Sequence, residues 1–205
     1  MTPSAPVLPP QHPDVDTLLA ALITCGNRPT RKLVAQLAAA DFPVLVHGAR
    51  VAELAVEIGR HLRIADERLV ILCRAALLHD VGKRHMPRAV LDKPGPLGTD
   101  ERRLLEEHPL VGEQVMRSAG LVAEATIVRH HHERWDGGGY VDHLSGPSIP
   151  LESRIISAAD AFDAMTSERA YRAAGARYAA LVEIDRAADS QLDPRCAAAL
   201  CDVVG

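Results

Sequence analysis

A histidine and an aspartate stand side by side at the end of an apolar run, at His79-Asp80, and Lys83 follows three residues later. A neutral imidazole can bind one metal ion, and a neighbouring carboxylate can bridge two. His-Asp alone is weak support for a metal site, because the pair occurs by chance in many proteins. Further groups of the same kind recur at intervals of roughly 20–30 residues: His47, His108, His131, His132 and Asp160.

These side chains form a donor set of imidazoles and carboxylates. Such ligands suit Fe or Mn, and less selectively Zn or Ni, and no cysteine joins the pattern as it would in a structural zinc site. A single histidine on an apolar face, such as His47, is more often a core residue, and His131-His132 beside His130 could be a chance polar run. Seven groups that fall at element ends or on apolar helix faces are hard to explain as core residues, so the sequence predicts one metal centre.

The elements that must position these groups are predicted to be helices. Aromatic residues make up only 3% of the chain, and alanine, leucine and valine are abundant, which favours an all-α fold. A helix over 43–62 would place His47 on its apolar stripe, and Asp66 is expected to cap the next helix. Segments 86–98 and 136–150 are expected to be loops. Other helices are expected near 14–25, 29–40, 99–107, 110–119, 121–133, 151–165, 178–188 and 194–203.

Composition also indicates which partners to expect. A net charge of −4 gives no basic footprint for a nucleic acid polymer, and no apolar run reaches the roughly 18 residues of a membrane span. Four cysteines lack metal-site spacing and are expected to be reduced, mostly buried and in a cytoplasmic protein. The proline-rich start is expected to be a disordered tail and not a signal peptide. The pattern leaves the oligomeric state open.

Ordered motifs from about residue 44 to about residue 194 resemble a known family. The chain is similar to the HD superfamily of metal-dependent phosphohydrolases and, within it, to the HD-GYP family of cyclic di-GMP phosphodiesterases. The matching segments are HDVGK at 79–83, LDKPGPL at 91–97, EHPLVG at 107–112, HHERWDG at 131–137, GY at 139–140, IPL at 149–151, RII at 154–156, DAFDAMT at 160–166 and RAYR at 169–172.

The resemblance implies a fold and a set of roles. It implies an all-α HD-domain helical bundle over 43–205, with a metal centre in the helix core, preceded by a tail and short helices over 1–42. Two divalent metal ions, Fe or Mn, would hold a bridging hydroxide as nucleophile. The implied ligands are His47, His79 and Asp160 for one metal and His108, His131 and His132 for the other, with Asp80 between them. Lys83 would contact the scissile phosphate, and Gly139, Tyr140, Arg169 and Arg172 would line the nucleotide site.

Three positions depart from the family pattern. Val141 stands where the family has the proline of Gly-Tyr-Pro, and Ala170 stands for the proline of Arg-Pro-Tyr-Arg. Because proline fixes φ, the Val141 change bears on the shape of the loop and on the choice of substrate. Pro43 occupies the position where some members carry a glutamate that helps to hold a third metal. We therefore expect two metals.

The leading interpretation is hydrolysis of cyclic di-GMP or a related cyclic dinucleotide, with input from a signalling protein as a possible partnership. The alternatives are an HD phosphohydrolase of another nucleotide, an HD-type di-iron oxygenase and an inactive cyclic-dinucleotide sensor. Trp135 or Tyr140 could stack on a base or anchor the glycine loop. Glu133 and Asp136 are expected to orient the histidines, and His130 competes with its neighbours for a ligand position.

Overall fold

Helix α3 (Phe42–His61) lies at the centre of the structure, a computed structural model that describes residues 21–22, 25–167 and 175–205. Within those residues the chain forms helices and no strand, as expected of an all-α protein. The other elements are α2 (Arg28–Ala40), α4 (Asp66–Leu77), η1 (Val81–His85), α5 (Arg88–Leu91), α6 (Thr99–Leu105), α7 (His108–Ser118), α8 (Val122–Arg129), η2 (Gly146–Ser148), α9 (Leu151–Ser167), α10 (Gly175–Ala187) and α11 (Pro194–Val204), with η marking 3-10 turns.

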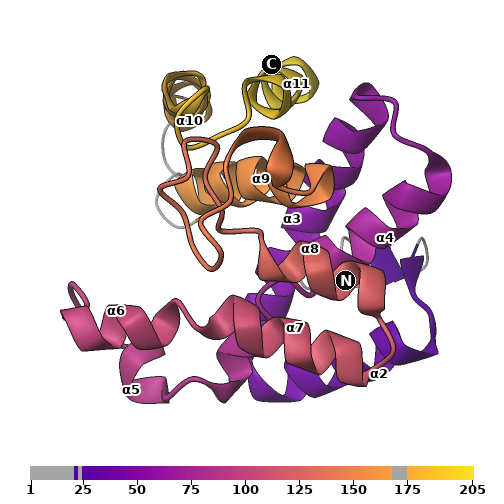
Figure 1. Ribbon diagram of the computed structural model, residues 1–205, viewed down its shortest axis with the longest axis vertical. Coiled ribbons are helices and arrows are strands. Elements are labelled where there is room, and N and C mark those ends of the chain that lie inside the picture. The colour runs from indigo at the N-terminus through magenta and orange to yellow at the C-terminus, as the bar shows by residue number, and fades with distance from the viewer. Residues whose placement is uncertain (1–20, 23–24, 168–174) are drawn as a thin grey trace, which may run out of the picture.

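Helices α2, α4, α9 and α11 pack around α3, and α8 packs against both α4 and α7 (Figure 1). Val51, Ala55 and Ile58 on the predicted apolar stripe of α3 are buried, and each fully buried valine or isoleucine contributes about 1.5–3 kcal/mol. Helix α2 shares this core through Leu33 and Leu37. The proposed domain division near residue 42 remains a prediction.

Local signals start the helices that surround the core. Asn27 and Asp41 accept hydrogen bonds from the backbone N–H groups of Thr30 and Val44, which caps α2 and α3. Both helices carry a proline in the first turn, where its missing N–H costs nothing. One expected cap is wrong: Asp66 is the first residue of α4, and the N-cap is Ala65, which has no side-chain bond.

Residues 86–107 project from the bundle as an arm that carries α5 and α6 (Figure 1). The expected loop at 86–98 therefore contains one helical turn. Arg88 stabilises that turn through ion pairs with Asp92 and with Asp41 of the main body. No residue of α5 or α6 is buried. Among the described residues, no helix is both long and apolar enough to cross a membrane.

Candidate metal centre

Three of the predicted histidines lie where one helix has just ended, at the end of α4, α6 or α8. The Nδ1–H of His79, His108 and His131 each donates to the carbonyl three residues earlier, at 2.7, 2.7 and 2.6 Å. Carbonyls in the last turn of a helix have no partner within it, so they are free to accept. Helix α8 ends at Arg129, four residues before the predicted end at Glu133, and this leaves His131 free to make its bond.

These bonds decide which ring nitrogen carries a proton. A carbonyl oxygen only accepts, so Nδ1 keeps the hydrogen and Nε2 presents a lone pair. Burial lowers the pKa of His79, and it lowers the pKa of His131 to about 3. It also holds the pKa of His132 well below its usual range. These three rings are therefore neutral, which is the form that binds a metal.

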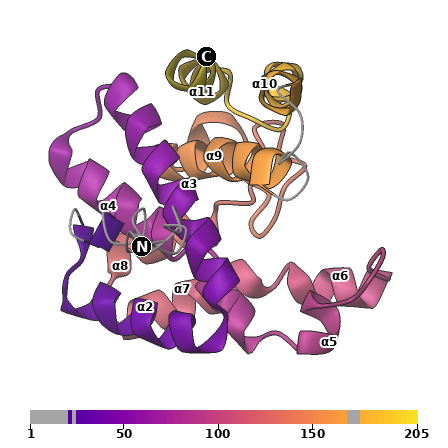
Figure 2. The same ribbon diagram turned by 180° about the vertical axis from the view of Figure 1, so that it is seen from behind.

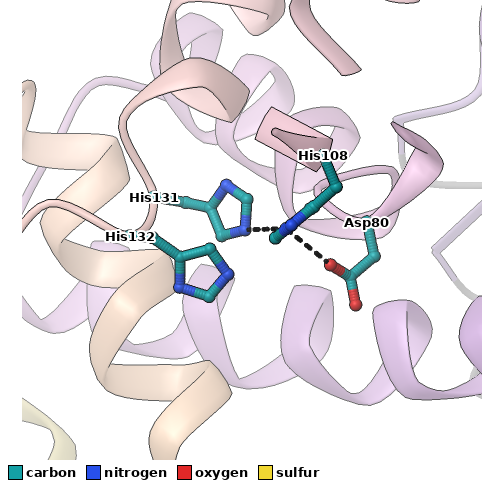
Figure 3. A group of neighbouring side chains, drawn as sticks. All are labelled: Asp80, His108, His131 and His132. Atoms are coloured by element: carbon teal, nitrogen blue, oxygen red, sulfur yellow. Dashed lines mark hydrogen bonds and ion pairs between the residues drawn. The ribbon is translucent and has the colours of Figure 1, made fainter. Parts of the chain in front are cut away.

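A first cluster joins Asp80, His108, His131 and His132, with one ligand atom of each within 4.8 Å of the others (Figure 3). His108 Nε2 lies 3.4 Å from His131 Nε2 and 3.3 Å from Asp80 Oδ1. Both Nε2 atoms carry lone pairs when the rings are neutral, so they cannot bond to each other. A cation among these atoms would turn a repulsive contact into coordination.

A second cluster joins His47 of α3, His79 and Asp80, and Asp160 of α9 lies beside it. His47 Nε2 lies 3.0 Å from Asp160 Oδ1 and 4.0 Å from Asp80 Oδ2, and His79 Nε2 lies 3.9 Å from Asp160 Oδ1. Burial lowers the pKa of His47, but its hydrogen bonds with Asp160 and Asp163 raise it to about 9 overall. The carboxylates of Asp160 and Asp163 thus flank the ring of His47.

Asp80 is the one residue common to both clusters. Burial raises its pKa, yet His79, Lys83 and His108 together hold it well below its usual range, so it is a carboxylate. Its Oδ1 and the Nε2 of His79 are buried and accept no hydrogen bond from any described residue. Buried polar atoms without partners are costly, and a bound cation would satisfy both. The residues present therefore fit a divalent metal centre with two adjacent positions.

Lys83 of η1 reaches the same carboxylate from the solvent side. Its Nζ lies 2.6 Å from Asp80 Oδ2, and its side chain is 27% exposed. Burial lowers the pKa of Lys83, but Asp80 raises it by more, so the ammonium keeps its charge. A cleft of about 670 Å³ opens over this group and is lined by Phe42, Val46, His47, Asp80, Lys83 and Asp160, among others.

Sequence reasoning missed a carboxylate that holds His47 in place. Asp163 Oδ2 lies 2.7 Å from His47 Nδ1, and Arg50 donates to both oxygens of Asp163, at 2.7 and 3.0 Å. A carboxylate on the far nitrogen fixes the tautomer and the orientation of a metal-binding histidine. The available signal was the spacing of Asp163, three residues after Asp160, which puts both on one face of α9.

We expect Asp163→Asn to weaken metal binding by about 10- to 100-fold at the position that includes His47 and to leave the other position unchanged. The amide lacks the charge that fixes the tautomer of His47. Titration of the metal-free protein with Mn(II), followed by calorimetry, should resolve one weakened and one unchanged site. Asp202→Asn is the matched control, because Asp202 pairs with the exposed His61 at 3.2 Å. Equal weakening of both sites would contradict a local positioning role.

The loop after His132 packs against this histidine. A Cβ on Gly139 would lie 2.5 Å from the carbonyl oxygen of His132, so only glycine allows this close approach. Tyr140, next in the chain, stacks on the His132 ring with centroids 4.9 Å apart. The predicted contact of Gly139 and Tyr140 with a nucleotide remains a prediction.

The contacts of the same loop show what Trp135, Glu133 and Asp136 do. Trp135 is an anchor, since its Nε1–H donates to Asp189 and Arg154 lies over its ring. Glu133 accepts from the backbone N–H groups of Asp142 and Leu144 and does not orient a histidine, and Asp136 pairs with Arg134. The expectation for both acids was therefore wrong, because their partners come from within the loop.

His130 is excluded from the clusters by its own bonds. Its Nδ1 bonds to the carbonyl of Thr126 at 2.9 Å, and its Nε2 lies 2.9 Å from Asp142. Arg169 and Arg172, the other predicted nucleotide contacts, lie outside the described residues.

Comparison with known proteins shows which family and which proteins this chain is similar to. The family model described as "HD domain" matches residues 32–196. The cyclic di-GMP phosphodiesterase response regulator RpfG of Xanthomonas campestris pv. campestris is 40% identical over 154 residues, which are 74% of this chain and 41% of that protein. The 3'3'-cGAMP-specific phosphodiesterase 3 of Vibrio cholerae is 41% identical over 155 residues, which are 75% of this chain and 34% of that protein.

Solved structures agree on the fold. The crystal structure of the cyclic GMP-AMP-specific phosphodiesterase V-cGAP3 of V. cholerae superposes with a TM-score of 0.66 at 21% identity, over 92% of this chain and 48% of that chain. The chain spans less than half the length of the two curated relatives named above. With four-fifths of its residues in the family model and its motifs in order, the chain belongs to the HD-domain family and to the HD-GYP branch that those motifs predict.

Proposed function

We propose that the chain is a metal-dependent phosphodiesterase that hydrolyses cyclic di-GMP or a related cyclic dinucleotide. The observation that carries this proposal is that two histidine–aspartate clusters share Asp80, which lines a cleft together with Lys83. The similarity to cyclic di-GMP and 3'3'-cGAMP phosphodiesterases supports the substrate class. Lys83 favours phosphate chemistry over oxygen chemistry, because an ammonium stabilises a phosphoryl anion.

Two divalent cations, Fe or Mn, are the proposed cofactors. His47, His79 and Asp160 would hold one cation, His108, His131 and His132 would hold the other, and Asp80 would contact both. Bound there, two such cations would neutralise charge on the phosphoryl oxygens and lower the pKa of water. The donor set contains no sulfur, which argues against a structural zinc site.

The chain supplies the remaining parts of the site from its own side chains. Lys83 keeps a positive charge at the cleft where negative charge grows on the phosphate. The bond of Asp163 to His47 and the carbonyl bonds to three other histidines hold the rings before substrate arrives. Such preorganisation avoids a reorganisation cost during the reaction.

We expect two metals per chain. Pro43 offers no side-chain oxygen, and Asp41 already accepts from the N–H of Val44 and from Arg88. Glu53 lines a different pocket, beside Phe162. Anomalous scattering at a metal edge counts the ions directly. Three strong peaks, with a protein carboxylate on the third, would contradict this expectation and make Asp41 the first residue to examine.

Phe42 is expected to contribute to substrate binding. It lines the cleft at the start of α3, yet 45% of it is exposed, which is unusual for a large apolar side chain. An aromatic ring beside a phosphate-binding cation suits a nucleobase, and stacking is worth about 1–3 kcal/mol per base. We expect Phe42→Ala to raise KM by about 10-fold with little change in kcat, and Phe42→Trp to preserve KM. Val122→Ala, at an exposed apolar residue of α8, is the control. Equal KM in Phe42→Ala and the unmodified protein would exclude this contact.

The deciding experiment incubates the purified protein with Mn(II) or Fe(II) and a panel of cyclic dinucleotides, with products separated by chromatography. Cleavage of at least one cyclic dinucleotide supports the proposal, and the panel identifies which one. Cleavage only of other nucleotides would support a different HD phosphohydrolase. Oxygen consumption without phosphate chemistry would support an oxygenase, and tight binding without cleavage would support a sensor. Input from a signalling partner and a cytoplasmic location remain proposals.

A further inference from the structure

A second cavity, of about 810 Å³, lies between α2, η1 and α7. Helices α2 and α7 lie at the end of the bundle opposite α10 and α11 (Figure 2), and η1 contacts both of them. The cavity shares no lining residue with the catalytic cleft. The two use different parts of η1: Lys83 lines the cleft, and Arg84 and His85 line the second cavity. Below it is called the α2–η1–α7 pocket.

Positive charge gathers at the α2–η1–α7 pocket in a protein whose net charge is −4. Its described lining includes the cations Arg28, Lys32 and Arg84, the imidazole of His85, and no acidic residue. None of the four makes an ion pair with a described residue, and Arg84 is held only by a 3.1 Å hydrogen bond to the neutral Gln36. Elsewhere many arginines are paired with carboxylates, as Arg129 is with Glu113 and Asp142. Converging cations without acidic partners favour an anion.

The rest of the lining is uncharged, and apolar side chains share it with the polar Gln36, Gln114 and Ser118. Pro29, Leu33, Val111 and Val115 contribute to the wall between the charged groups. Small-molecule sites typically enclose about 300–1,000 Å³ and combine apolar walls with a few convergent polar groups. The α2–η1–α7 pocket has a volume in that range, and its wall likewise combines apolar side chains with a few polar and charged groups.

We propose that the α2–η1–α7 pocket binds a phosphorylated small molecule of nucleotide size, at a site separate from the catalytic centre. The guanidinium of Arg84 and the ammonium of Lys32 would bind the phosphates, since a guanidinium matches phosphate geometry and an ammonium acts as a point charge. The apolar wall would contact the base or another flat group. A protein partner fits less well, because the exposed large apolar residues Phe42, Val122 and Tyr178 all lie outside this pocket.

The test uses the full chain, stripped of metal, so that its result does not depend on hydrolysis. Inorganic pyrophosphate and ADP are titrated by calorimetry, and an oligoglutamate peptide is a third probe. We expect both phosphate probes to bind, with ADP tighter than pyrophosphate. Lys32→Ala and Arg84→Ala should each weaken binding by about 10-fold or more, the usual effect of losing a charged hydrogen bond. Arg195→Ala, an exposed arginine of α11, should leave binding unchanged.

Three results would overturn the proposal. The first is unchanged ADP affinity in both Lys32→Ala and Arg84→Ala. The second is binding that disappears in Lys83→Ala but survives in Lys32→Ala, because the probe would then occupy the cleft. The third is no binding of either phosphate probe at about 1 mM. If oligoglutamate alone binds, the surface belongs to an acidic protein segment instead.

Discussion

Replacing Asp80 with alanine is expected to remove both metal ions and to reduce hydrolysis below detection. Asp80 belongs to both clusters, and its oxygens lie 3.3 Å from His108 Nε2 and 3.5 Å from His79 Nε2. A terminal histidine serves one position only, so losing it should leave the other ion in place. The loss of Asp80 also leaves several histidines around a site with no central anion. Elemental analysis of the purified variant, together with activity, measures the effect.

Two variants separate this effect from a loss of folding. Asp80→Asn keeps the volume of the side chain and removes its charge, so it should also lose metal while circular dichroism still reports a helical protein. Asp92→Ala removes an exposed aspartate that pairs with Arg88 in the arm, and it should keep full metal content. Two ions bound to Asp80→Asn at normal affinity would show that Asp80 does not join the two positions.

Lys83→Ala is expected to keep both metals and to lower kcat by about 10²-fold or more. The ammonium stays charged beside Asp80 and faces the cleft, where it can stabilise charge that grows on the phosphate. A group that acts mainly in the transition state lowers kcat when it is removed. Steady-state kinetics with a cyclic dinucleotide, combined with metal analysis of the same sample, gives both quantities.

A structural role for Lys83 predicts a different result. If the ammonium only neutralises Asp80, its removal should change metal affinity and leave the rate of the fully loaded enzyme intact. Lys93→Ala is the matched control, because Lys93 pairs with Glu101 in the arm and has no contact with the clusters. An unchanged kcat for metal-loaded Lys83→Ala would exclude a role in phosphate chemistry.

Much of the fold could be predicted because its signals are local. Helices α2 and α3 each begin with an N-cap residue, Asn27 or Asp41, and a proline in the first turn. Such a start signal involves only three or four consecutive residues, and both helices lie where the sequence predicts them. The positions of His79, His108 and His131 could also be predicted, since each stands just past a helical run. Helix ends leave carbonyls without partners, and a histidine placed there gains a fixed orientation.

Contacts between distant residues could not be predicted in the same way. The bond between His47 and Asp163 joins residues 116 apart in the chain. Periodicity places each residue on a face of its own helix, but the rotation and depth at which α3 meets α9 depend on the packing of every side chain between them. For the same reason the role of Trp135 stayed open and the expected role of Glu133 was wrong, because the path of the loop decides which partners these two side chains meet.

The sequence alone determined the helical class, the family and the metal-binding residue types, because those follow from local composition and ordered motifs. The family resemblance implied two ligand sets joined at Asp80, and the tertiary structure brings these groups together in two clusters that share it. Only the tertiary structure decided that Asp163 holds His47 and that the bonds of His130 keep it out of both clusters. It also brought Lys32 and Arg84 to one pocket, although α2 and η1 are far apart in the chain. Distances across helices are a property of packing, and local sequence patterns do not encode them.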